Sequence, residues 1–270
     1  MKREIKKLVN YIGFDIVRFT KEEKKVLEEP QNSKSKKSDK LKFHITETGR
    51  YYLPEDAVDD IVANSIINNQ VFDKEIVDCA ANFIKPGSVV LDLGANYGQM
   101  SVLFSKMVTE KGKVYSFDAD DFIFEILKKN LNANNCKNVE PFFGAVHNIE
   151  GEVLVFPEQD FVRFGAYGSY GIDYTATKKG REVPTLTIDG LNIQREISFM
   201  KIDIQGGDLF AMQGAIETIK RNQMPILFEF EYLFQDDMHL VFQDYVDFVS
   251  QINYKFARVI NAQNYLILPK

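Results

Sequence analysis

Cysteine is scarce in this chain, and long apolar runs are missing. Its 270 residues contain two cysteines, Cys79 and Cys136. Two cysteines predict neither a disulfide framework nor a zinc-type cysteine pair, which is typical of a protein in a reducing compartment. No stretch approaches the roughly 18 uninterrupted apolar residues of a membrane helix, and the first residues lack the apolar core of a secretory signal. We therefore expect a cytoplasmic protein that does not span a membrane.

Positive charge is lacking over most of the chain. The net charge is -6, but residues 1–42 hold 13 Lys and Arg against 7 Asp and Glu, a net of +6. The remainder therefore holds 20 against 32, a net of -12. Because nucleic-acid binding needs a basic surface for the phosphates, the acidic body argues against nucleic acid as the main partner.

The basic residues 1–42 are expected to form a short helix and a polar linker, ahead of one catalytic domain over residues 43–270. The apolar residues at helical spacing are Ile5, Leu8, Val9 and Ile12. The linker, EEPQNSKSKKSDKLK, is poor in bulky apolar residues. Two interpretations of the helix remain open. It packs on the body or on a second subunit of a homo-oligomer, or it lies on the anionic inner face of a membrane.

From Phe43 onward, short apolar strands alternate with amphipathic helices, a pattern that predicts a mostly parallel sheet covered on both faces. Strands are expected at residues 89–93, 113–117, 139–143, 152–156, 199–204 and 226–230. Helices are expected at residues 55–69, 73–84, 98–109, 121–134, 207–221 and 238–252. Residues 254–260 and 264–268 predict an antiparallel hairpin. Residues 157–182, rich in Gly and Tyr, predict a long functional loop.

The segment VVLDLGANYGQM, residues 89–100, joins a buried strand to a helix through Gly94 and Gly98. Such a turn places backbone N–H groups at the carboxyl edge of the sheet, where open α/β sheets bind ligands. Gly94 permits the sharp turn, and Gly98 is expected to leave room for a ligand. Asp118 ends the next strand, where a carboxylate can accept hydrogen bonds from both hydroxyls of a ribose. Together these features predict a nucleoside site.

The spacing of the glycines favours one nucleoside. A dinucleotide site has GxGxxG, whereas this chain has GANYG, with Asp92 two residues before the first glycine. S-adenosylmethionine has no phosphate, and its amino-acid end needs both donors and acceptors. Asp92 and the backbone of residues 94–97 are expected to supply these. A nicotinamide-dependent oxidoreductase and a non-catalytic binding protein on the same fold remain alternatives.

Seven ordered segments between Asp73 and the C-terminus share one known sequence pattern. They are FDKEIVDCAANFIKPGSVVLDLGANYGQMSVLFS, VYSFDAD, LKKNLNANN, FFGAVHNIEGEVLVF, PTLTIDGL, MKIDIQGGDLFAMQGAIETI and PILFEFEY. They resemble the FkbM-type S-adenosylmethionine-dependent methyltransferases. The resemblance implies a Rossmann-like, seven-stranded class I methyltransferase sheet, mostly parallel with a C-terminal antiparallel hairpin. It also implies O-methylation of a carbohydrate or glycan-precursor hydroxyl in polysaccharide biosynthesis.

The chain departs from that family pattern at four positions. The family often has Glu in place of Gln205 and Asp208, and Glu-Pro in place of Asp118 and Ala119. The first difference is mild, since Gln keeps an acceptor oxygen. The second bears only on the detail of the ribose contact.

The resemblance also implies which residues bind the cofactor. These are Glu75, Gly94, Ala95, Asn96, Tyr97 and Gly98 at the methionine end, Asp118 at the ribose, and Gly144, Ala145 and Val146 at the adenine. For Ala145 and Val146, packing at a strand end is an equally good interpretation. His147 follows them and is expected either in the cleft or in an ordinary turn.

Methyl transfer to a hydroxyl requires that the acceptor is held in line with the methyl group, an effect that lowers the barrier by roughly 7 to 11 kcal/mol. It also requires a base for the hydroxyl proton, which raises the rate by about 10² to 10⁴. Asp203, at the end of FMKID, is the first candidate for that base, and His147 and Glu229 are alternates. Of Glu229 and Glu231, only one is expected on a given face. Asp203 and Glu229 could instead bind a divalent cation. No tight DxD-type cluster appears, so no metal site is predicted.

Overall fold

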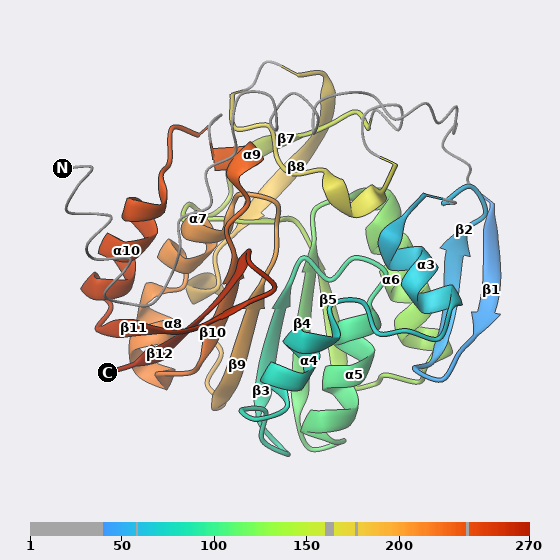
Figure 1. Cartoon of the computed structure of the whole chain (residues 1–270), viewed down its shortest axis with the longest axis horizontal. Helices are drawn as coiled ribbons and strands as arrows, with labels where there is room; N and C mark the ends of the chain where they lie inside the picture. Colours follow the sequence, from blue (N-terminus) through green and yellow to red (C-terminus); the bar gives the residue numbers. More distant parts are fainter. Residues whose placement is uncertain (1–39, 58, 160–164, 176–177, 236–237) are drawn as a thin grey trace.

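Seven strands form the central sheet of the protein, whose structure is a computed structural model. They are β3 (Val89–Leu93), β4 (Lys113–Asp118), β5 (Val139–Phe143), β9 (Ile197–Ile202), β10 (Ile226–Glu229), β11 (Tyr254–Ile260) and β12 (Asn264–Pro269). Their order is β11-β12-β10-β9-β3-β4-β5 (Figure 1). The strands from β5 to β10 are parallel, and β12 runs antiparallel to both of its neighbours. The predicted seven-stranded, mostly parallel sheet with a C-terminal antiparallel hairpin is confirmed.

The structure describes residues 40–57, 59–159, 165–175, 178–235 and 238–270. The expected basic helix and nearly all of the expected linker lie outside these residues. None of the helices in the described ranges is both long and apolar enough to cross a membrane.

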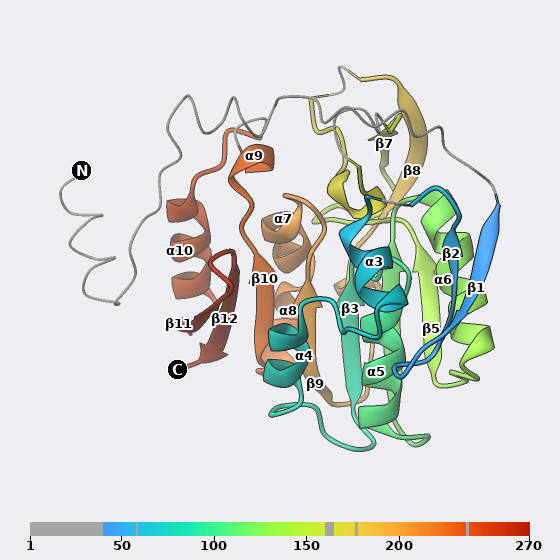
Figure 2. The same ribbon diagram turned by 45° about the vertical axis from the view of Figure 1, so that its right-hand side comes forward.

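Helices cover both faces of the sheet, and the central strand β3 is therefore buried on both sides. The first group is α3 (Ile61–Ile67), α4 (Lys74–Ala80), α5 (Gln99–Val108) and α6 (Asp121–Ala133). The second group is α7 (Asp208–Gln213), α8 (Ile216–Asn222) and α10 (Phe242–Gln251). Val90 belongs to the core under the first group, and its neighbour Leu91 belongs to the core under the second, as strand alternation requires. Figure 2 shows α4 and α5 on the near side of the sheet and α8 on the far side.

The expected helix over residues 207–221 is two helices, α7 and α8, separated at Gly214. A Cβ atom at Gly214 would lie 1.9 Å from the carbonyl oxygen of His147. The break therefore occurs where the chain after β5 packs directly on the backbone of this helical segment.

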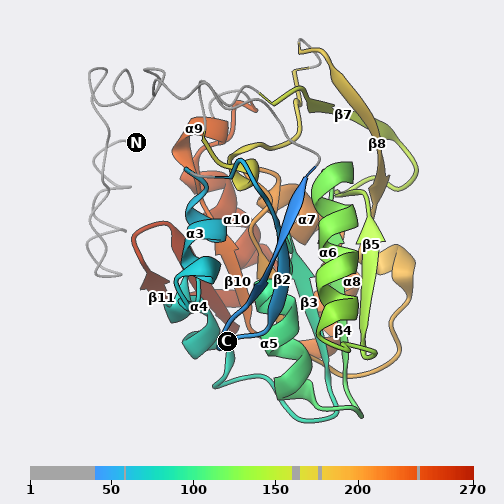
Figure 3. The ribbon, with the colours of Figure 1, turned by 90° about the vertical axis from the view of Figure 1, so that its right-hand side faces the viewer.

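Two small sheets accompany the central one. The sequence pattern did not predict β1 (Leu41–Ile45) and β2 (Arg50–Pro54), which pair as a hairpin beside α6 (Figure 3). The amide oxygen of Asn130 on α6 accepts a hydrogen bond from the N–H of Tyr52, at 2.6 Å.

The second small sheet contains β6 (Ala145–Val146), β8 (Gly180–Leu186) and β7 (Val153–Pro157), in that order. The expected strand at residues 152–156 therefore exists but lies outside the central sheet. The expected loop of residues 157–182 contains the beginning of β8 and a 3₁₀ turn, η1 (Tyr167–Ser169). The remaining short elements are η2 (Asp189–Leu191) and α9 (Tyr232–Gln235).

Candidate active site

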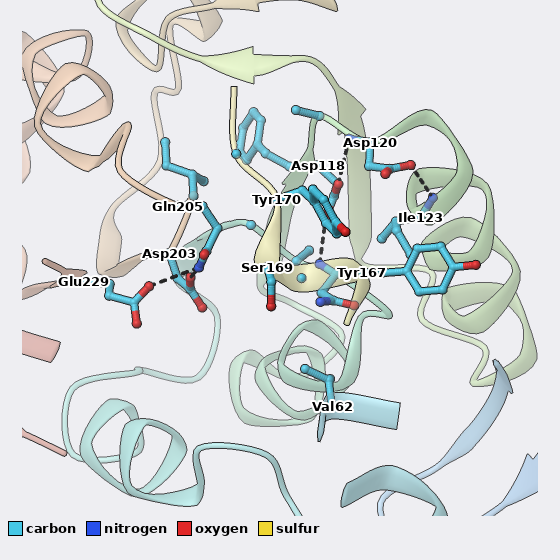
Figure 4. Close-up of a pocket in the computed structure, with 18 of the residues that line it drawn as sticks. Val62, Asp118, Asp120, Ile123, Tyr167, Ser169, Tyr170, Asp203, Gln205 and Glu229 are labelled. Atoms are coloured by element: carbon cyan, nitrogen blue, oxygen red, sulfur yellow. Dashed lines mark hydrogen bonds between the residues drawn. The ribbon is translucent and has the colours of Figure 1, made fainter. Parts of the chain in front are cut away.

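A cavity of about 480 Å³ lies at the carboxyl ends of β3, β4, β5, β9 and β10, within the size range of small-molecule sites. The predicted site residues that line it are Gly94, Ala95, Asn96, Tyr97, Asp118, Gly144, Ala145, Val146, Asp203 and Glu229. Figure 4 shows Asp118, Asp203 and Glu229 among them. Those outside its lining are Glu75, Asp92, Gly98 and His147. The structure thus brings together residues from five strand ends, those of β3, β4, β5, β9 and β10.

The turn after β3 requires its glycines for contacts with protein. Gly94 has φ +80°, and a Cβ atom there would lie 1.7 Å from the backbone oxygen of Asp203. Gly98 has φ +84°, and its Cβ would lie 2.6 Å from the Cδ1 atom of Leu127 on α6. The expectation that Gly98 leaves room for a ligand is therefore replaced by a packing role. Gly94 brings β3 and the end of β9 together, which sets the floor of the cavity.

The backbone donors of this turn are largely satisfied inside the protein. The N–H groups of Gly94 and Ala95 both donate to the carbonyl oxygen of Phe117, at 3.0 and 2.9 Å. The N–H of Asn96 donates to Asp118 Oδ2 at 2.9 Å. The turn is therefore tied to the end of β4, and the expected supply of free backbone donors is reduced.

Asp118 lines the cavity with its carboxylate held by two backbone N–H groups. Oδ2 accepts from Asn96, and Oδ1 accepts from Asp120 at 3.0 Å. Each oxygen keeps a lone pair for another donor. Burial, followed by the nearby charge of Asp120, raises the pKa of Asp118 to about 7. A ribose with two hydroxyl donors fits this carboxylate in its ionised form.

A buried lysine connects β3 to the end of β9. Lys201 is 2% exposed, and its Nζ donates to the carbonyl oxygen of Gly94 at 2.8 Å. It lies 3.6 Å from Asp92 Oδ1 and 3.5 Å from Asp203 Oδ2. Burial opposes the charge on Lys201, but the two carboxylates outweigh it and raise its pKa.

Asp92 lies beneath the cavity and is fully buried. Its Oδ2 accepts a hydrogen bond from Ser101 at 2.5 Å. Asp92 was predicted to contact the cofactor, and the structure instead places it among the internal polar groups that support the turn. Asp92 forms an ion pair with the ammonium group of Lys201.

Gln205 joins the two predicted catalytic carboxyl groups. Its Nε2 donates to Asp203 Oδ1 and to Glu229 Oε2, each at 3.1 Å (Figure 4). Burial, followed by the charges of Asp203 and Glu231, raises the pKa of Glu229 well above its usual range. Glu231 also lines the cavity. The expectation that only one of the two glutamates shares this face was wrong, because β10 ends at Glu229 and strand alternation ends with it.

Two other predicted residues lie elsewhere. Glu75 is exposed on α4, whereas Asp73, which immediately precedes that helix, lines the cavity. His147 is 7% exposed, and its ring packs against Tyr174 and Phe210 with centroids 5.9 and 4.9 Å away. Burial lowers the pKa of His147. This packing keeps His147 out of the cavity lining, which removes the reason to place it among catalytic candidates.

The segment of residues 165–175 forms one wall of the cavity, and sequence reasoning did not predict how it is held. Asp60 is fully buried, and its Oδ2 accepts from the backbone N–H of Tyr167 at 2.9 Å and from the hydroxyl of Tyr97 at 3.0 Å. Tyr97 belongs to the glycine turn. One carboxylate oxygen therefore joins the turn and the wall.

The turn of the β11–β12 hairpin supplies further cavity residues that sequence reasoning missed. Asn261, Gln263 and Asn264 all line the cavity. Because β11 is parallel to β10, its end reaches the same edge of the sheet. The predicted hairpin could have indicated these residues. No group of three or more His, Cys, Asp or Glu in the described ranges is arranged to hold a metal ion.

Comparisons with known proteins give methyltransferases. The family model of the methyltransferase FkbM domain matches residues 92–256. That of the protein-L-isoaspartate(D-aspartate) O-methyltransferases matches residues 21–148. The ubiquinone/menaquinone biosynthesis C-methyltransferase UbiE of Salmonella arizonae is 28% identical over 111 residues, 39% of each chain. The chain thus spans about two fifths of the length of the curated relatives it matches.

Two solved structures show the range of similarity. Methyltransferase FkbM from Methylobacillus flagellatus KT has a TM-score of 0.45 at 14% identity, over 76% of this chain and 52% of that chain. A SAM-dependent methyltransferase from Aquifex aeolicus has a TM-score of 0.39 at 18% identity, over 73% of this chain and 88% of that chain.

The sheet order and the glycine turn beside Asp118 define a class I methyltransferase fold. More than half of the chain matches one family model, so the protein belongs to the FkbM methyltransferase family. Its cofactor is S-adenosylmethionine, and a nicotinamide cofactor is not favoured. The residues fit this group, since the lining offers the Asp118 carboxylate, whose oxygens each keep a lone pair for a ribose hydroxyl.

Proposed function

We propose that the protein transfers a methyl group from S-adenosylmethionine to a hydroxyl of a sugar or surface-glycan precursor. When bound, the cofactor supplies the methyl group: the carbon–oxygen bond to the acceptor forms as the carbon–sulfur bond breaks. The substrate class follows from the resemblance to FkbM-type enzymes. What the chain contributes is the position of its carboxyl groups around the cavity.

The observation that carries the proposal is the placement of Asp203. Its carboxylate lines the same cavity as the glycine turn, and it is held by Lys201 at 3.5 Å and by Gln205 at 3.1 Å. Asp203 is 23% exposed, so it can reach a ligand while its orientation is fixed. In this proposal Asp203 accepts the hydroxyl proton, which is worth about 10² to 10⁴ in rate.

Glu229 has the complementary role. Burial and the charge of Asp203 raise its pKa, so Glu229 carries its proton at neutral pH. A neutral carboxyl group can donate a hydrogen bond to an acceptor oxygen, whereas an ionised one only accepts. Gln205 fixes the position of the two carboxyl groups relative to each other, because its amide nitrogen donates to both.

The proposal is tested by mass spectrometry of surface glycans from cells with and without the protein. The expected difference is one methyl group on a sugar hydroxyl. In the purified protein, Asp203→Asn should lower kcat by about 10² to 10⁴ and leave S-adenosylhomocysteine affinity within a few-fold. Glu217→Gln, at a surface residue whose side chain is 68% exposed, is the control. Identical glycan masses, or normal turnover by Asp203→Asn, would contradict the proposal.

A further inference from the structure

The charges around the cavity are unevenly distributed. The acidic residues in its lining are Asp73, Asp118, Asp120, Asp203, Glu229 and Glu231. Lys201 is the only Lys, Arg or His among the described residues that line it. Asp118 and Asp120 lie at the end of β4, three strands from β10, which corresponds to about 14 Å. The other four form what we name the acidic end of the cavity.

Lys201 does not neutralise the acidic end. Its Nζ lies within 3.6 Å of Asp92 and Asp203 and donates to the backbone oxygen of Gly94. With Asp92 included, this part of the protein has five carboxyl groups and one ammonium group. The amide side chains that complete this end carry no charge, and they are Gln205, Asn261, Gln263 and Asn264.

An amide oxygen at the same end also lacks a hydrogen-bond donor. Asn264 lines the cavity and is 3% exposed, and its Oδ1 accepts no hydrogen bond from the described residues. A buried acceptor without a donor costs about 1 to 3 kcal/mol. Carboxylates and this amide together offer acceptors, so a ligand that fits them has to bring donors.

The pKa values at the acidic end reflect the same imbalance. Burial, followed by the charge of Asp203, raises the pKa of Glu231 to about 7 and also raises that of Asp73. A ligand ammonium group would replace these protons, because it offers three donors and a positive charge. A phosphate or carboxylate would meet no uncompensated cation in the described lining.

We infer that the acceptor carries a protonated amine close to the hydroxyl that is methylated, as a free amino sugar does. The inference rests on the proposed function and narrows its substrate. It places the ammonium group of the acceptor beside Asp73 and Glu231, and it excludes acceptors with a phosphate or carboxylate at that position. The competing acceptor is a neutral sugar, which has the hydroxyl but no protonated amine.

The test measures affinity in the protein loaded with S-adenosylhomocysteine. Glucosamine, glucose and glucuronic acid are titrated by calorimetry at low ionic strength, at a pH where the amine is protonated. Glucosamine should bind about 10-fold more tightly than glucose, and glucuronic acid should bind most weakly. Added salt should reduce the preference.

Two variants separate charge from shape. Glu231→Gln keeps the size of the side chain and should lower the preference for glucosamine several-fold, whereas Glu217→Gln should leave all three affinities unchanged. The inference is overturned by absence of glucosamine binding, by equal affinity for glucosamine and glucose, or by glucuronic acid binding as well as either. Those results leave methyl transfer to a neutral or anionic sugar intact, and the glycan comparison tests that separately.

Discussion

Replacement of Lys201 by methionine tests whether the buried ammonium group organises the site. Lys201 is 2% exposed and Asp92 is fully buried. Asp92 Oδ1 lies 3.6 Å from Lys201 Nζ and accepts no hydrogen bond. At an effective dielectric constant of about 20, two charges at this distance attract by roughly 5 kcal/mol. Removal of one partner of such a pair typically costs about 3 to 5 kcal/mol, so Lys201→Met should lower the free energy of unfolding by that amount.

Urea unfolding followed by circular dichroism measures this loss, with the m-value as a check on two-state behaviour. Lys74→Met is the matched control, because Lys74 pairs with Asp78 at the surface, where both side chains are more than 60% exposed. It should cost less than about 1 kcal/mol. The double variant Asp92→Asn/Lys201→Met should recover much of the loss, since the fully buried charge of Asp92 is removed with its partner, whereas the remaining carboxylate, Asp203, is 23% exposed to solvent. A Lys201→Met protein within about 1 kcal/mol of wild type, or a double variant no more stable than the single one, would refute the reasoning.

Four further predictions concern the glycine turn and its neighbours. S-adenosylhomocysteine affinity should rise about 10-fold from pH 6 to pH 8, because Asp118 ionises with a pKa of about 7, and Asp118→Asn should abolish this dependence in calorimetry. The free protein should lose stability as pH rises from 3.8 to about 7, because the folded-state pKa lies above the ordinary one. Gly94→Ala should abolish S-adenosylhomocysteine binding, whereas Gly151→Ala, with φ +77° and no atom within 4 Å of the added Cβ, should retain it at a cost of about 1 to 2 kcal/mol in urea unfolding. Asp60→Asn should cost about 1 to 3 kcal/mol and speed hydrogen exchange at the Tyr167 amide; unchanged exchange would contradict the bond.

The local sequence pattern was sufficient to predict the strands that carry the site residues. The bounds of β3 match the predicted residues 89–93, because a short apolar run followed by a glycine turn has few alternatives. Asp118 and Asp203 follow such runs, so their place at the carboxyl edge was predictable. Glu75 lies outside the cavity lining, because the chain meets the cavity at Asp73, before α4 begins. Two residues along a helix turn the side chain by about 200°.

Contacts between distant parts of the chain were not predictable from the same pattern. Asp60 and Tyr167 are 107 residues apart, and neither position has a local signal for their hydrogen bond. The β1–β2 hairpin depends on Asn130, 78 residues beyond Tyr52. The break at Gly214 depends on the backbone of His147. These features arise from tertiary packing, which overrides local propensity.

The shared oxygen of Asp60 has a consequence for both the glycine turn and the cavity wall. Movement of the wall at Tyr167 disturbs the same carboxylate that holds the hydroxyl of Tyr97. Loss of the Tyr167 bond would therefore also change the support of the Tyr97 hydroxyl. A substitution at Asp60 should accordingly affect the glycine turn and the cavity wall together.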